Sequence, residues 1–158
     1  MPETKVAFFI PRTLMEAWVA RARGDDAAAR TAFTASRAEV EKTMREQPDF
    51  GPPLCVLGLI DAGLGRKEDA IREGRRASEL LPVAKDSLNG AHIMHYLGVI
   101  YAWTGEKDLA IEQIAAILKF PGLLSYGELR LSPFWDPLRG DSRFEKLVEQ
   151  AKKPVALN

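Results

Sequence analysis

The chain has 158 residues, of which 46% are hydrophobic and 28% are charged, a composition typical of a folded globular domain rather than a disordered chain. The 22 Lys and Arg residues equal the 22 Asp and Glu residues in number, so the chain lacks the basic surplus of a nucleic-acid-binding or polybasic membrane-binding protein. The single cysteine excludes an internal disulfide and leaves little for a structural zinc site.

The N-terminal residues do not predict a targeting segment. The apolar run 6–10 is too short for the core of a signal peptide, and no small-residue cleavage site follows it. The longest apolar run elsewhere, around residues 54–60, is too short to cross a bilayer. We therefore expect a cytoplasmic protein with no membrane partner.

Apolar residues recur at helical spacing through most of the chain, and no segment shows the strict alternation of a strand. Prolines at 48, 82 and 121 mark helix ends, and Asp86 or Ser87 suits the cap of a fifth helix. The fold class expected is therefore all-α. The predicted helices span residues 12–22, 26–47, 53–63, 67–81, 88–103 and 107–119.

The pattern changes after residue 121. Residues 126–130 predict a short helix and 132–140 an ordered loop, and Asp141 suits the cap of a last helix that ends near residue 152. A helical array must cover its last apolar face. The side chains expected to do so are Phe134, Trp135, Leu138 and Phe144.

One short pattern occurs three times. Each copy has a glycine, then charged residues, then an alanine five positions after the glycine, and the copies are 41 and 40 residues apart. The glycine accepts the positive φ of a turn between helices, and the small alanine lets two helices approach closely. The pattern predicts consecutive helical hairpins with turns at Gly24, Gly65 and Gly105.

The second and third copies resemble the tetratricopeptide repeat, whose pattern runs W-x2-L-G-x2-Y, then G, then A-x3-F, then P. The matching residues are Leu57, Gly58, Gly65, Ala70, Ala77 and Pro82 in one copy and Leu97, Gly98, Tyr101, Gly105 and Ala110 in the other. The resemblance implies a right-handed α-α superhelix of about three hairpins in a single domain, 1–158. Its parts would be a degenerate first repeat (11–47), the second and third repeats (51–84 and 88–124) and a capping segment (125–158).

Two residues depart from the repeat pattern. Asp61 stands where the second copy should have tyrosine, and Gly74 stands where it should have phenylalanine. A glycine within a helix costs about 1 kcal/mol relative to alanine. We therefore expect Gly74 to face a large side chain of a neighbouring helix, with Tyr101 as the candidate.

The tail, residues 129–144, is similar to the ending of tetratricopeptide regions in large bacterial signalling proteins, including winged-helix regulators, nucleotide cyclases and Ser/Thr kinases. The resemblance implies a sensory or docking module of such a protein. The chain contains no kinase, cyclase or winged-helix motif, so none of those activities is expected of it.

In the tetratricopeptide family the first helix of each hairpin lines a concave groove. Positions that form a carboxylate clamp in some members correspond here to Leu14, Trp18, Val56, His92 and Tyr96. None of them is Lys, Arg or Asn, which argues against that mode of binding. The resemblance implies a mostly apolar and aromatic groove lined by Trp18, Arg21, Cys55, Leu59, His92, His95, Tyr96, Val99 and Trp103.

The function expected is non-catalytic binding of a protein or peptide, with an apolar or amphipathic segment as partner, because aromatic anchors carry most interface energy. Several alternatives stay open. The aromatic residues can belong to the core, or the chain's own residues 1–10 can fill the groove. The array can self-associate as a homodimer, or it can be a ligand-sensing regulatory domain with a pocket near His92 and His95.

A catalytic or metal site is the last alternative. His92 and His95 share a helix face, and Cys55 occupies the position equivalent to His95 one hairpin earlier, an arrangement that suits an activated thiolate or metal ligands. However, neighbouring helix axes lie about 8–10 Å apart, and no nearby carboxylate orients a histidine. We expect no catalytic residue, metal or cofactor. Acidic residues alternate with the cations of 66–76, which predicts a solvated face.

Overall fold

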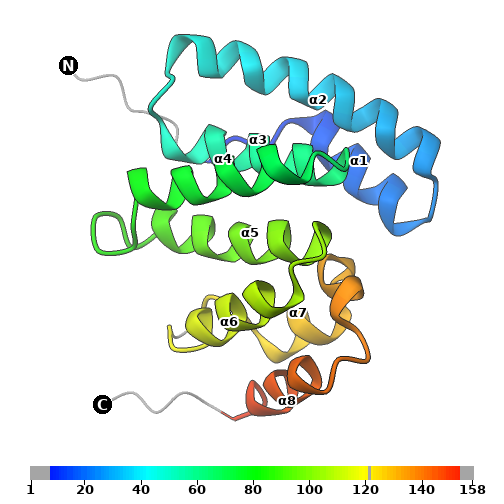
Figure 1. The fold of residues 1–158 in the computed structure, drawn as a ribbon, viewed down its shortest axis with the longest axis vertical. Coiled ribbons are helices and arrows are strands. Elements are labelled where there is room, and N and C mark those ends of the chain that lie inside the picture. Colours follow the sequence, from blue (N-terminus) through cyan, green and yellow to red (C-terminus); the bar gives the residue numbers. More distant parts are fainter. Residues whose placement is uncertain (1–7, 121, 154–158) are drawn as a thin grey trace.

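The computed structural model describes residues 8–120 and 122–153, and every regular element in them is a helix (Figure 1). The first six helices begin and end within two residues of the predicted positions. None of the helices in these two ranges is both long and apolar enough to cross a membrane. The elements are α1 (Arg12–Ala22), α2 (Asp26–Glu46), α3 (Gly51–Gly63), α4 (Lys67–Leu80), α5 (Asn89–Trp103), α6 (Lys107–Ile117), α7 (Tyr126–Leu131), the 3-10 helix η1 (Pro133–Leu138) and α8 (Ser142–Gln150).

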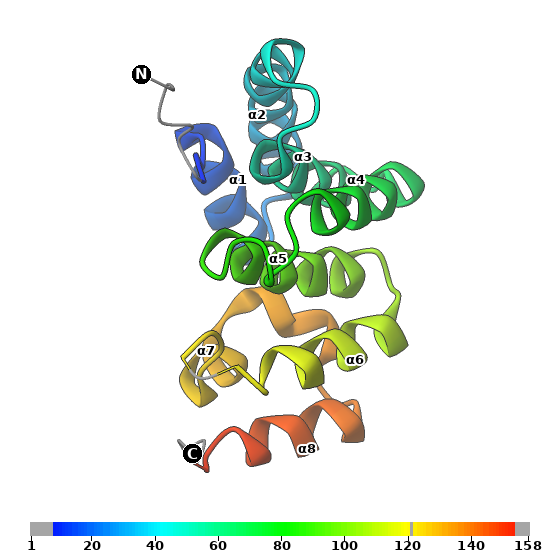
Figure 2. The same ribbon diagram turned by 90° about the vertical axis from the view of Figure 1, so that its left-hand side faces the viewer.

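Successive helices reverse direction at the predicted glycines. Gly24, Gly65 and Gly105 have φ angles of 73°, 78° and 81°, in the region that only glycine adopts without strain. The alanine that follows each glycine is buried, so α1 packs on α2, α3 on α4 and α5 on α6. The three helical hairpins follow one another along the long axis of the molecule (Figures 1 and 2).

The core lies around α3 and α5, which have apolar residues on all sides. A helix of this kind is stable only where other helices surround it. Accordingly, α3 contacts α2, α4 and α5, and α5 contacts α3, α4, α6 and η1. The more polar α2 and α4 lie outside them.

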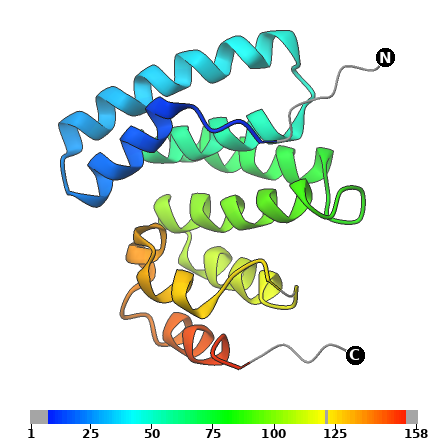
Figure 3. The same cartoon turned by 180° about the vertical axis from the view of Figure 1, so that it is seen from behind.

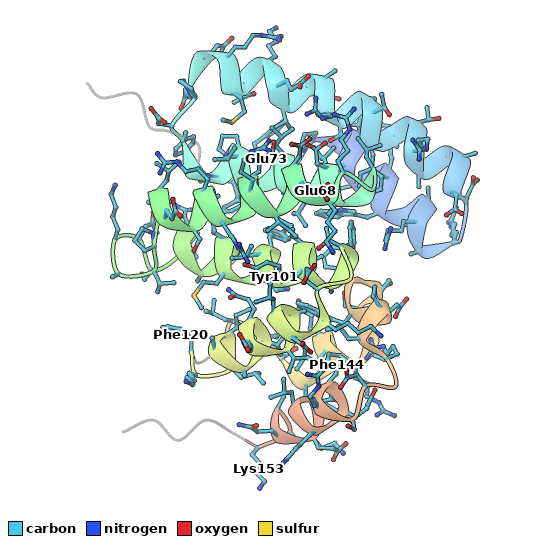
Figure 4. The ribbon with its side chains drawn as sticks, in the orientation of Figure 1. Glu68, Glu73, Tyr101, Phe120, Phe144 and Lys153 are labelled. Carbon is cyan, nitrogen blue, oxygen red and sulfur yellow. The ribbon has the colours of Figure 1, made fainter. Side chains whose placement is uncertain are left out.

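The tail folds back onto the array instead of extending from it. The prediction of a loop over 132–140 was wrong, because Ser132 accepts a hydrogen bond from the backbone N–H of Phe134 and starts η1. Figure 3 shows η1 beside α5, with α7 and α8 beyond it. Trp135, Leu138 and Phe144 have no exposed surface, and Phe144 comes from α8, which packs on α6 (Figure 4).

Two local predictions are resolved by side-chain contacts. A Cβ atom on Gly74 would lie 2.8 Å from Cδ1 of Ile100 and 3.0 Å from Cδ1 of Leu97, so this glycine faces large side chains of α5, although Tyr101 is not among the nearest. The residue directly before α5 is Leu88, and Asp86 stabilises the turn that leads into the helix, because its Oδ1 accepts hydrogen bonds from the backbone N–H groups of Leu88 and Asn89.

Candidate binding site

The predicted groove residues divide into buried and accessible sets. Cys55, Leu59 and Val99 have no exposed surface, because α3 and α5 are enclosed by their neighbours. We therefore remove these three residues from the candidate site. The side chains that keep some accessible surface are Trp18, Arg21, His92, His95, Tyr96 and Trp103.

The chain's own tail covers much of the accessible set. The ring centres of Trp135 and His95 lie 5.6 Å apart. The Trp135 ring also packs beside Gly98, where an added Cβ atom would lie 3.4 Å from it. Phe134 lies edge-on to Trp18 and Trp103, at centroid distances of 5.0 and 5.7 Å. Its backbone carbonyl accepts a hydrogen bond of 3.0 Å from Nε1 of Trp103. The middle of the expected groove is thus occupied by η1.

The N-terminal segment covers a second part of this surface. Phe8 lies 5.6 Å from the ring of His92 and 5.7 Å from that of Tyr96, whereas Phe9 is 64% exposed. Residues 1–7, which include part of the segment expected to fill the groove, lie outside the described residues. Phe8 and η1 therefore exclude an external peptide from the parts of α5 that they cover.

The Cys–His combination is not assembled as a reactive site. Burial raises the pKa of the Cys55 thiol well above its usual range, so this sulfur stays protonated. Nδ1 of His92 lies 2.8 Å from the backbone carbonyl of Leu88. The expectation that no carboxylate orients a histidine was wrong, because Nε2 of His95 lies 2.8 Å from a carboxylate oxygen of Glu128, which α7 brings next to α5. Across the described ranges, no group of three or more His, Cys, Asp or Glu side chains is arranged to hold a metal ion.

One part of the predicted surface stays open. A hollow of about 570 Å³ lies where the C-terminal ends of α1 and α5 meet η1, the region where blue, yellow-green and orange ribbons converge in Figure 3. Trp18, Trp103 and Phe134 supply aromatic walls, and Arg21, Asp26 and Asp136 supply charge. The other lining residues are Val19, Ala22, Ser132, Pro133 and Pro137. We call this space the aromatic hollow.

The charge at the centre of the aromatic hollow is that of Arg21. Its guanidinium carbon lies 4.1 Å from the centre of the Trp103 ring, a cation–π contact. Burial lowers the pKa of Arg21, and the charges of Asp26 and Asp136 act in the opposite direction. An arginine with so high an ordinary pKa remains charged, so the aromatic hollow contains a fixed cation.

Three of the eleven residues that line the aromatic hollow could be predicted from the sequence. Trp18, Arg21 and Trp103 were predicted to line the groove, but Phe134 was expected only to cap the array. We did not expect that Pro133, Asp136 and Pro137 of η1 would line the same space. The clustered residues Pro133, Phe134, Asp136 and Pro137 were the available signal, because prolines in a tail restrict the chain to a defined path.

A second group of polar residues lies within and beside the core, away from the aromatic hollow. Asp61 on α3 is fully buried, and its carboxylate accepts hydrogen bonds of 2.7 and 3.3 Å from Arg37 on α2. Glu73, on α4 (Figure 4), is nearly buried. Burial, followed by the charge of Asp61, raises the pKa of Glu73 to about 8. We assign this cluster to the packing of α2, α3 and α4.

The chain matches no protein-family model. No curated protein matches it either, and no solved structure does. The tetratricopeptide resemblance therefore rests on the sequence motifs alone.

Proposed function

We propose that the chain is a non-catalytic peptide-binding module built as a right-handed superhelix of tetratricopeptide-like hairpins, and that its binding site is the aromatic hollow. The observation that supports this function is the position of Trp18, Trp103 and Phe134 around an open space next to a half-buried arginine. Aromatic and arginine side chains in concave surfaces are the residues that dominate protein interfaces.

The available space limits what binds. A hollow of about 570 Å³ accommodates a few side chains, as small-ligand and peptide pockets do. Phe8 and η1 already cover α5 on the same side. The proposed ligand is therefore a short segment of a partner protein instead of a long helix laid along the whole array.

The test blocks the aromatic hollow without removing a core residue. Ala22 is exposed and lies in its wall, so Ala22→Arg fills the space while the helix end accepts the added cation. Peptides selected on the wild-type protein from a random library are expected to lose binding to Ala22→Arg and to keep it with Ala35→Arg, a change at an exposed position of α2. Failure to select any peptide, or equal binding to both variants, contradicts the proposal.

Self-association is a second candidate function, because Met15 and Val19 on α1 are 49% and 50% exposed and lie one helical turn apart. A dimer that forms through α1 would bury both. Sedimentation velocity over a range of concentrations tests this candidate. A dimer that Val19→Glu disrupts supports self-association, and a monomer at every concentration rules it out.

A further inference from the structure

The aromatic hollow contains an arginine, Arg21, whose guanidinium pairs with no acceptor among the described residues. The guanidinium carbon of Arg21 lies over the ring of Trp103, 4.1 Å from its centre. No carboxylate or carbonyl within residues 8–120 and 122–153 forms an ion pair or hydrogen bond with this guanidinium. A guanidinium stacked on an aromatic ring keeps its N–H edge free for a planar acceptor with two oxygens. A carboxylate is the acceptor that fits this edge.

The surrounding charges restrict the kind of carboxylate that fits. Asp26 and Asp136 line the same hollow, but neither lies within ion-pair distance of Arg21. Two anions around one cation oppose the entry of a run of acidic residues. The aromatic hollow therefore suits a single carboxylate with neutral or basic neighbours.

A second, shallower hollow continues the surface over α1. Its volume is about 420 Å³ and it shares Val19 with the aromatic hollow. Its lining includes the exposed Met15, the cations Arg12 and Arg23 and the anions Glu16 and Asp25, and Glu16 forms an ion pair with Arg12. A bound segment that leaves the aromatic hollow across Val19 enters this second hollow. In a segment that continues through both hollows, the carboxylate that reaches Arg21 belongs to a side chain and not to the end of the chain.

We propose that the two hollows together bind an extended internal segment of a partner protein in which one Asp or Glu side chain pairs with Arg21 and an adjacent apolar or aromatic side chain packs against Phe134. This inference rests on the proposed function and specifies the ligand of the same site. It also gives a role to Arg21, whose guanidinium lies over Trp103 and has no acceptor in the part of the chain that the structure describes.

The probe is a random dodecapeptide library displayed with both ends fused, selected on the wild-type protein. Binding of the selected sequences is then measured by fluorescence polarisation with end-blocked synthetic peptides. We expect them to share one acidic residue next to an apolar or aromatic one. Because a hydrogen bond to a charged group contributes about 1.5–3 kcal/mol, Arg21→Gln is expected to weaken binding about tenfold or more.

Three controls test whether the loss of binding in Arg21→Gln comes from an ion pair between Arg21 and the acidic residue of the peptide. Arg30→Gln, at an exposed position of α2, is expected to leave binding unchanged, and circular dichroism checks that each variant is folded. Replacing the acidic residue of the peptide by its amide is expected to weaken binding as Arg21→Gln does. The two changes combined are expected to cause no further loss, as for partners in one interaction.

The outcomes separate this inference from the proposed function. Peptides that Ala22→Arg excludes, but that lack an acidic residue or bind Arg21→Gln as well as the wild type, overturn the inference and leave the proposed function in place. The inference is also overturned if only a library with free C-termini yields Arg21-dependent peptides. A library that yields no peptide, or only peptides unaffected by Ala22→Arg, overturns both.

Discussion

The polar cluster in the core illustrates how single residues determine the packing of this protein. Asp61 stands where a tyrosine was expected, in the last turn of the apolar helix α3, and its carboxylate is fully buried. A buried charge is tolerated only when it is paired and hydrogen-bonded, and Arg37 supplies both. The side chain of Arg37 also forms an ion pair with Glu41 on its own helix.

The first prediction concerns this ion pair. Removal of one partner of a buried ion pair costs about 3–5 kcal/mol when the other charge is left uncompensated, and Arg66, whose Nε lies 4.0 Å from the Asp61 carboxylate, offsets the loss of Arg37 only in part. Because Arg37 is 21% exposed, we expect Arg37→Gln to lower the free energy of unfolding by about 2–4 kcal/mol. Chemical denaturation measures this change. Arg30→Gln, on the exposed side of the same helix, should cost almost nothing, and equal effects of the two variants would contradict the assignment.

The second prediction concerns pH. The folded state holds the proton of Glu73 more tightly than the unfolded state, since the pKa is raised from 4.5 to about 8. The free energy of unfolding should therefore fall as pH rises from about 4.5 to about 8, by at least about 1 kcal/mol. Denaturation at several pH values should show a smaller fall for Glu73→Gln and the wild-type fall for Glu79→Gln. Identical profiles for the wild type and Glu73→Gln would contradict the shifted pKa.

At the scale of elements, the six helices of the hairpins could be predicted because local signals determine them. Apolar spacing identifies the helices, and the glycines at 24, 65 and 105 mark the turns. The 3-10 helix was not predicted, because Ser132, Pro133 and Pro137 also suit a loop and only its packing against α5 decides between the two.

The third prediction concerns the entry into α5. A Cβ atom on Gly90 would lie 2.7 Å from backbone atoms of Val83 and 2.8 Å from one of Pro82, so the preceding loop would have to move. Overpacking of this kind costs about 1–3 kcal/mol, and we expect Gly90→Ala to lower the thermal midpoint. Gly127→Ala in α7, where the nearest atom is 3.9 Å away, should not lower it. A Gly90→Ala protein as stable as the wild type would show that the loop is not held against α5.

At the scale of the whole molecule, the tail is part of the fold and also forms a wall of the aromatic hollow. Trp135 and Leu138 pack in the same cluster as Val99 and Ile114, while Phe134 faces the aromatic hollow. The sequence predicted aromatic anchors and a covering tail, but not that the tail would cover most of the groove. That outcome depends on contacts between residues more than thirty positions apart, such as Trp103 with Phe134.

The fourth prediction follows from this integration. Trp135 has no exposed surface, so Trp135→Ala leaves a large cavity and should cost about 3–5 kcal/mol. Thermal unfolding of the variant should still show one transition, because the tail and the hairpins share a core. Two separate transitions, or no loss of stability, would contradict a tail that is integral to the fold.

The central claim is that the aromatic hollow is the site of peptide binding, and the chain's three tryptophans test it directly. Their indole N–H groups give separate NMR signals that single Trp→Phe substitutions assign. When a selected peptide is added, the signals of Trp18 and Trp103 should shift, and that of the buried Trp135 should shift least. Saturating peptide that leaves the Trp18 and Trp103 signals in place would contradict the claim.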